Sequence, residues 1–174
     1  MYQTPWKELI NTLAWGIILL SWVIMSHTHI AMNQSESTER CLHKNNILVW
    51  NVQGAGNKEF LNILREHIRM HKPSVIGLVE TRISGRKAQE VCDKIGFTNC
   101  FRVVAQGFQG GIWVLWNSHE IVVEVVFSHD QFVTVEITPP NNRRWFLTVV
   151  YASPHAHMRE TLWQELQRCA AEYC

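Results

Sequence analysis

Short apolar runs alternate with turn residues along most of the chain. Residues 47–52 read ILVWNV and residues 74–79 read SVIGLV, and both runs have the length of a buried strand. Between them, residues 58–70 carry apolar side chains at the spacing of one helix face: Phe60, Leu61, Leu64 and Ile68. This order predicts strand, helix, strand, which favours two parallel strands lying beside each other.

The second half of the chain follows a different pattern. A helix is predicted at 86–95, and strands then follow one another without a helix between them, separated by clusters of Gly, Asn, Ser and Pro. The predicted strands are 99–104, 111–116, 120–127, 131–137 and 144–151, and a final helix covers 158–173. An antiparallel meander after a parallel opening predicts a mixed sheet with flanking helices, in the α/β or α+β class.

The first 45 residues differ from the rest. Residues 13–25 read LAWGIILLSWVIM and carry no charge, but this run is shorter than the about 20 residues of a membrane-spanning helix. It fits the apolar part of a signal sequence, a membrane anchor, a buried or interfacial helix, or a hydrophobic extension without a targeting role. Residues 27–46 read as a polar linker. We therefore expect an extension at 1–45 and a folded domain at 46–174, with a membrane or secretory location only if 13–25 acts as a signal or anchor.

Composition and charge exclude several classes of protein. Hydrophobic residues make up 47% of the chain, which excludes a disordered protein. Lys and Arg number 16 against 15 Asp and Glu, so there is no global attraction to nucleic acid or acidic membranes, and an anionic ligand must be held locally. The 5 cysteines include no Cys-x-x-Cys pair, which favours reduced, inert thiols over a disulfide framework or a zinc site.

Three polar residues stand at the ends of predicted strands. Asn51 interrupts the first apolar run, Glu80 follows the second, and Tyr151 ends the run FLTVVY. The carboxyl ends of parallel neighbours meet at one edge of a sheet, where a carboxylate and an amide suit a hard cation such as Mg²⁺. Other interpretations remain open: Asn51 can satisfy a turn, Glu80 can be solvated, and Tyr151 can cap the core.

These positions, taken together, resemble a known family. The strings ILVWNVQGAGN, SVIGLVETR, GGIWVLWN and VVYASPHAHMRETLWQEL resemble the first half of the endonuclease/exonuclease/phosphatase superfamily. They are most similar to the apurinic-endonuclease-like endonuclease domain of plant LINE-type (non-LTR) retrotransposons. The resemblance covers residues 46–172. The matching positions are Trp50, Asn51, Gly54, Gly56, Asn57, Glu80, Thr81, Arg82, Gly110, Gly111, Trp116, Tyr151, Ser153, Pro154, Arg159, Leu162 and Trp163.

The resemblance implies a two-sheet sandwich with flanking helices and a magnesium-dependent phosphodiesterase site that acts on DNA. In this family Glu80 would be the metal ligand, Asn51 would hold the network around metal and phosphate, and Tyr151 would hydrogen-bond the scissile phosphate. Arg82, Arg86 and Lys87 are candidate DNA contacts, with solvated loop charges as the alternative. The family relationship also implies a nuclear or cytoplasmic location.

The chain departs from the family in two motifs. The sequence contains neither Gly-Asp-Phe-Asn, which orients the attacking water, nor Ser-Asp-His, which supplies the histidine. We therefore expect a truncated, catalytically inactive endonuclease-like domain in which the carboxyl-terminal half and most of the second sheet are missing.

A missing sheet has a physical consequence. An apolar sheet face that includes Trp113, Leu115 or their neighbours on the opposite face of the strand would be uncovered, which marks an interface or an aggregation-prone surface. The alternative function is therefore a binding module whose exposed face is covered by a second copy or a protein partner. A third hypothesis is a membrane-tethered protein held by residues 13–25.

Overall fold

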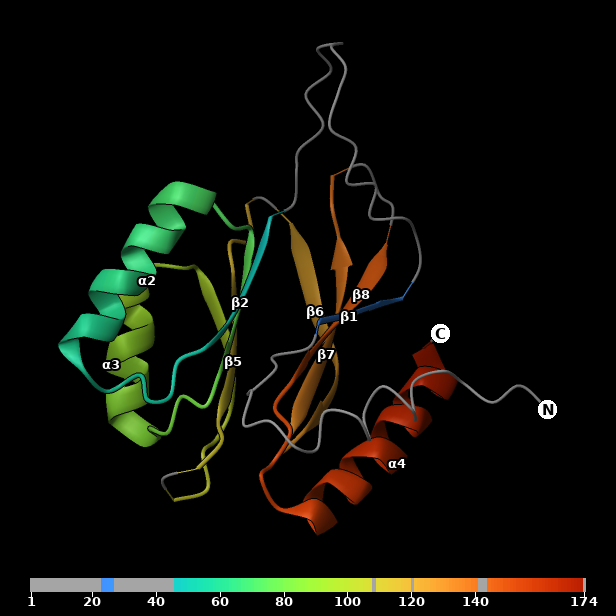
Figure 1. Ribbon diagram of the computed structural model, residues 1–174. Coiled ribbons are helices and arrows are strands. Elements are labelled where there is room, and N and C mark those ends of the chain that lie inside the picture. Colours follow the sequence, from blue (N-terminus) through green and yellow to red (C-terminus); the bar gives the residue numbers. More distant parts are fainter. Residues whose placement is uncertain (1–22, 27–45, 108, 120, 141–143, 174) are drawn as a thin grey trace, which may run out of the picture.

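Two sheets pack face to face, with helices on both outer sides. The computed structural model describes residues 23–26, 46–107, 109–119, 121–140 and 144–173, and the side chains of 23–26 and 173 are not described. Helices α2 and α3 cover the outer face of one sheet, and α4 lies on the outer side of the other (Figure 1). The predicted mixed α and β class is confirmed.

The first sheet contains the parallel pair that the sequence predicts. Its strand order is β2-β3-β5-β4, and β2 runs parallel to β3 while the other pairs are antiparallel. The strands are β2 (Ile47–Asn51), β3 (Val75–Val79), β5 (Ile112–Trp116) and β4 (Asn99–Val103). A parallel pair needs a long crossover, and α2 (Lys58–His71) supplies it.

Helices α2 and α3 (Gly85–Ile95) form where the apolar spacing predicts them. The Asn57 side chain caps α2 by accepting a 2.6 Å hydrogen bond from the amide of Phe60. Phe60 and Leu64 of α2 and Val91 of α3 are buried against the sheet, in one apolar cluster with its outward-facing side chains.

The second sheet corrects one expectation. Its order is β1-β8-β7-β6, with β1 (Val23–Ser26), β8 (Trp145–Val150), β7 (Phe132–Thr138) and β6 (Val122–His129), all antiparallel. The expectation that most of this sheet is missing is wrong, because the last three strands of the predicted meander form a four-stranded sheet together with β1. Helix α4 (Ala156–Tyr173) packs on its outer side through a cluster that includes Leu162 and Phe132.

The prediction of an uncovered face at Trp113 or Leu115 is also wrong. These side chains are 1% and 0% exposed and pack beneath α2 and α3. Ile112 and Val114, which point to the opposite face of β5, pack against the second sheet. Strand β5 is therefore covered on both faces, which removes the physical reason for a partner at this position.

The amino-terminal apolar run lies largely outside the described residues. At its end, Val23–Ser26 pairs antiparallel with β8, with Val23 opposite Val149. None of the helices in the described ranges is long and apolar enough to cross a membrane. The expected boundary between extension and domain at residue 45 stays a prediction.

The two sheets come into close contact where β3 carries Gly77. A Cβ built on Gly77 would lie 2.9 Å from Cγ2 of Val149 on β8 and 3.4 Å from Cγ2 of Val49. Both valines pack in the core between the sheets, where a stiff β-branched side chain has little room to move. Gly77 therefore sets the spacing of the sandwich near its centre.

We predict that Gly77→Ala destabilises the protein by about 1–3 kcal/mol, because the added methyl group overpacks the interface between the sheets. Urea denaturation measures the change. Combining it with Val149→Ala should destabilise the protein less than the sum of the two single changes. Val135→Ala on β7 is the matched control and should add to Gly77→Ala without coupling. If Val149→Ala and Val135→Ala both add to Gly77→Ala without coupling, the close contact between Gly77 and Val149 would be contradicted.

Candidate functional site

The parallel pairing of β2 with β3 brings two of the predicted site residues to one edge. Asn51 is the register partner of Val79, the residue before Glu80. Backbone hydrogen bonds continue the pairing past the strand ends, since the Val52 amide donates to the Val79 carbonyl at 3.0 Å and the Gly54 amide to the Glu80 carbonyl at 2.8 Å. The loops after both strands are thus held side by side.

Glu80 is a buried carboxylate at this edge. It is 4% exposed, and its φ of +56° turns the chain out of the strand immediately after Val79. Its carboxylate accepts a hydrogen bond from the Arg82 guanidinium, whose side chain is 40% exposed. A buried carboxylate without a partner would be costly, so Arg82 compensates the charge of Glu80 in this structure.

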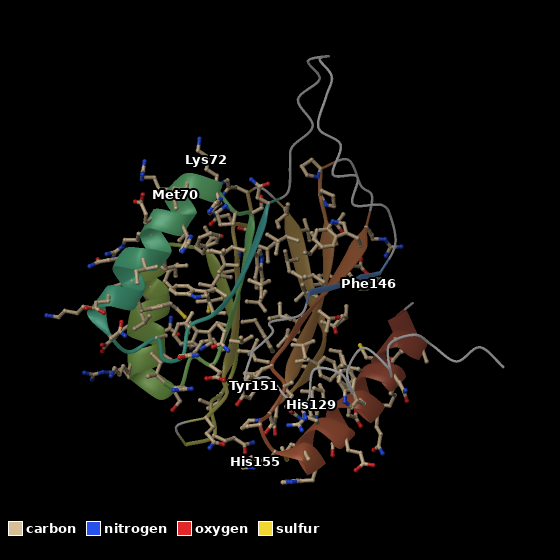
Figure 2. All side chains as sticks on the ribbon, viewed as in Figure 1. Met70, Lys72, His129, Phe146, Tyr151 and His155 are labelled. Carbon is tan, nitrogen blue, oxygen red and sulfur yellow. The ribbon has the colours of Figure 1, made fainter. Side chains whose placement is uncertain are left out.

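Tyr151 lies at the same edge, directly after β8. Figure 2 shows it at the lower end of the sandwich, between the two sheets, while Met70 and Lys72 lie at the opposite end. Burial raises the pKa of the Tyr151 phenol, the negative charge of Glu80 raises it further, and the positive charge of Arg82 lowers it. The phenol is therefore within the electrostatic range of the Glu80–Arg82 pair.

Gly110 and Gly111 allow the segments that carry Thr81, Arg82 and Tyr151 to pack closely together. The amides of Thr81 and Arg82 donate to the carbonyls of Gly111 and Gly110, at 3.3 and 3.1 Å. A Cβ on Gly110 would lie 3.3 Å from Cε1 of Tyr151, and one on Gly111 would overlap the Thr81 hydroxyl. The Thr81 hydroxyl oxygen is buried and has no hydrogen-bond partner. The Gly-Gly pair thus lets three chain segments meet at the edge.

A buried glutamine fixes the loop that follows Tyr151. Gln131 is 2% exposed; its amide nitrogen donates to the Met158 carbonyl at 2.7 Å, and its amide oxygen accepts from the Ser153 amide at 2.9 Å. The Tyr151 amide donates to the Gln131 carbonyl at 2.7 Å. The sequence pattern does not identify Gln131, because the first position of a predicted strand gives no sign that its side chain is buried.

Asn51 is oriented by its own turn. Ile47 and Val49 of β2 pack in the core between the sheets, so alternation places Asn51 on that face of the sheet. Its side-chain oxygen accepts a 3.3 Å hydrogen bond from the Gln53 amide. Asn51 therefore has the turn-forming role that the sequence left open. It also lies at the end of β2, on the edge formed by β2 and β3.

The three basic residues proposed to contact DNA do not form one group. Arg82 pairs with Glu80, whereas the Arg86 side chain is 93% exposed and pairs with Glu90 along α3 at 3.1 Å. The Lys87 amine lies 3.1 Å from the position that a Cβ would take on Gly56, so it covers the glycine turn after β2. Of the three, the structure brings only Arg82 onto Glu80.

The donor chemistry of the edge suits Mg²⁺ with few protein ligands. Within the described ranges, no group of three or more His, Cys, Asp or Glu side chains is placed to hold a metal ion. A single carboxylate, Glu80, with the amide of Asn51 at the same edge of the sheet corresponds to the kind of site in which water and phosphate supply most ligands of Mg²⁺. The Arg82 guanidinium would compete with the cation for the carboxylate.

Comparisons with known proteins add no assignment. Neither the comparison with protein-family models nor the comparison with curated proteins finds a match for this chain. The resemblance to the endonuclease/exonuclease/phosphatase superfamily therefore stays a prediction that depends on the motifs and on the geometry of the edge.

We predict that Glu80→Gln lowers the pKa of Tyr151 from its raised position toward the ordinary value of 10.0. The reason is that loss of the carboxylate charge makes the phenolate less unfavourable, while burial, the larger cause, continues to raise the pKa. Titration of phenolate absorbance measures this, with Tyr151→Phe subtracted to remove the signals of the other tyrosines. Glu90→Gln is the matched control. Identical titrations of Tyr151 in the wild-type and Glu80→Gln proteins would contradict the proximity of the two groups.

Proposed function

We propose that residues 46–174 form an endonuclease-like domain of the endonuclease/exonuclease/phosphatase type, related to the endonuclease domains of plant LINE-type retrotransposons. In this proposal the edge binds Mg²⁺ and a DNA phosphate, but the chain does not cleave DNA. The observation that carries the proposal is the meeting of buried Glu80, its partner Arg82 and the phenol of Tyr151 where β3 and β8 end.

Each residue of the edge has a distinct role in this proposal. Glu80 would hold the metal ion, and the Asn51 amide would complete the polar surroundings. The Tyr151 hydroxyl, which like any phenol is protonated at neutral pH, would donate a hydrogen bond to a phosphate oxygen, and its raised pKa extends this protonated state to more alkaline pH. When Glu80 turns to a metal ion, Arg82 would become available to a phosphate oxygen. A bound Mg²⁺ would neutralise charge on the phosphate and on the leaving oxygen.

The proposed lack of cleavage follows from the chemistry of water attack. Orienting a nucleophile contributes about 7–11 kcal/mol of barrier lowering in well-aligned systems. The sequence contains neither of the two motifs that supply this orientation in the family. Glu80, the acidic group buried at the edge, is assigned to the metal and is therefore not available as a base.

We predict that Mn²⁺, used as a spectroscopic substitute for Mg²⁺, binds the full chain weakly and that Glu80→Gln removes this binding. Arg82→Gln should tighten it roughly two- to fivefold, because a partly exposed ion pair is worth about 0.5–1 kcal/mol. Electron paramagnetic resonance of free Mn²⁺ measures the affinity. Glu90→Gln, which changes an exposed carboxylate on α3, is the control and should bind as the wild type does. Equal binding by Glu80→Gln and wild type would overturn the metal assignment.

Cleavage is tested separately on supercoiled plasmid with Mg²⁺. We expect no more nicking by the wild-type chain than by Glu80→Ala. Nicking that disappears in Glu80→Ala would contradict the proposed inactivity while leaving the metal assignment intact. The two experiments therefore distinguish failure of the metal site from failure of the inactivity prediction.

A further inference from the structure

A pair of cysteine thiols lies on the outer side of the first sheet. Cys92 of α3 and Cys100 of β4 are both thiols, and their sulfur atoms are 3.1 Å apart within hydrogen-bonding reach. Cys92 is 4% exposed and Cys100 is half-buried. A helix and an edge strand thus hold two sulfur atoms against each other, although the sequence predicts inert thiols.

A positive charge stands beside this pair. Arg102, on the same strand as Cys100, donates from Nη2 to the side-chain oxygen of Gln89 at 2.6 Å. Its other terminal nitrogen, Nη1, is buried and has no hydrogen-bond partner in the structure. A buried guanidinium nitrogen without an acceptor is costly, and a neighbouring thiolate would provide a compensating charge.

The two thiols differ in acidity. The hydrogen bond from Cys100 lowers the pKa of Cys92, and the charge of Arg102 lowers it further, against the opposing effects of burial and of Asp93. The hydrogen bond to Cys92, burial and the charge on Cys92 raise the pKa of Cys100. Cys92 is therefore the sulfur that ionises first, and Cys100 retains its proton.

We propose that Cys92 and Cys100 form an oxidisable dithiol site that hydrogen peroxide converts to an intramolecular disulfide. The Cys92 thiolate attacks one peroxide oxygen, the O–O bond breaks, and the released hydroxide takes up a proton to become water, which leaves Cys92 as a sulfenic acid. The Cys100 sulfur then attacks the Cys92 sulfur, the S–O bond breaks, and the hydroxyl group leaves as water with the Cys100 proton. Two thiols are oxidised, and one peroxide is reduced to two waters.

The chain provides its own comparison thiol. Cys169 of α4 is also buried, and its sulfur lies 3.4 Å from the Thr134 hydroxyl. The low exposure of Cys92 favours an oxidant as small as hydrogen peroxide over a bulky disulfide such as oxidised glutathione. Replacing Cys169 should leave the reaction at Cys92 unchanged.

The test uses the full chain with Cys41 and Cys174 replaced by serine, so that these two thiols do not contribute. The protein is treated with hydrogen peroxide, its remaining thiols are alkylated under denaturing conditions, and it is digested with trypsin. The expected product joins peptides 88–94 and 95–102 and has lost the mass of two hydrogens. It should form faster in the native chain than in the same chain unfolded in urea, and Cys169→Ser should form it equally fast.

Variants and a second reagent make the test decisive. Arg102→Gln should slow the bridging at least severalfold, because the positive charge beside Cys92 is lost. This variant lacks one trypsin site, so its Cys100 is followed in peptide 95–143. Arsenite, which is small enough to reach a buried thiol, should bind once per native chain and protect both peptides from alkylation, and Cys92→Ser should abolish that protection. Bridging no faster in the native than in the unfolded chain, or no arsenical protection of the native chain, would overturn the proposal. Neither measurement depends on the proposed endonuclease-like function.

Discussion

The buried carboxylate of Glu80 constrains the whole edge of the sandwich. A carboxylate that is 4% exposed needs a compensating charge, and Arg82 supplies it from two residues along the chain. Both residues adopt positive φ angles, +56° and +55°, so the segment after β3 turns tightly enough for the two side chains to meet. The segment that contains Gly110 and Gly111 is hydrogen-bonded to this turn. Because Gly110 has no side chain, the Tyr151 ring can pack close to that segment.

The parallel pair β2–β3 makes this convergence possible. Parallel strands release their chains at the same edge, so residues far apart in sequence arrive together without a long loop. The second sheet contributes Tyr151 from the end of β8, and Gln131 at the start of β7 holds the loop after it. The edge is therefore assembled from both sheets, and its geometry depends on how closely they pack at Gly77 and Val149.

Much of the fold follows from local patterns, because strands and helices with covered faces carry a clear hydrophobic period. The sequence predicts α2, α3, α4 and β2 to β8 with small shifts at their ends. It does not predict that the last three strands of the meander leave the first sheet and pack over Ile112 and Val114, because periodicity does not say which faces pack together. Strand β1 was missed as well, since its residues belong to an apolar run with no alternation.

The candidate site was predictable in part for a similar reason. Strand ends identify Glu80, Asn51 and Tyr151, whereas side-chain partners depend on contacts between distant segments. The prediction that Arg82 contacts DNA stays untested, and its pairing with Glu80 had no signal in the sequence. The contact between Cys92 and Cys100 likewise had no signal, because their spacing joins a helix to a strand through an intervening turn.

We propose that Glu80 provides a site for a divalent cation at the edge of the sandwich to which Asn51 and Tyr151 also belong. The most direct measurement is the anomalous scattering of Mn²⁺ in crystals of the full chain grown with that ion. The account predicts a peak bonded to the Glu80 carboxylate, with Arg82 displaced from it and the Tyr151 hydroxyl facing the same space. A Glu80 carboxylate that keeps its pair with Arg82 in such crystals, with no Mn²⁺ beside it, would contradict the account.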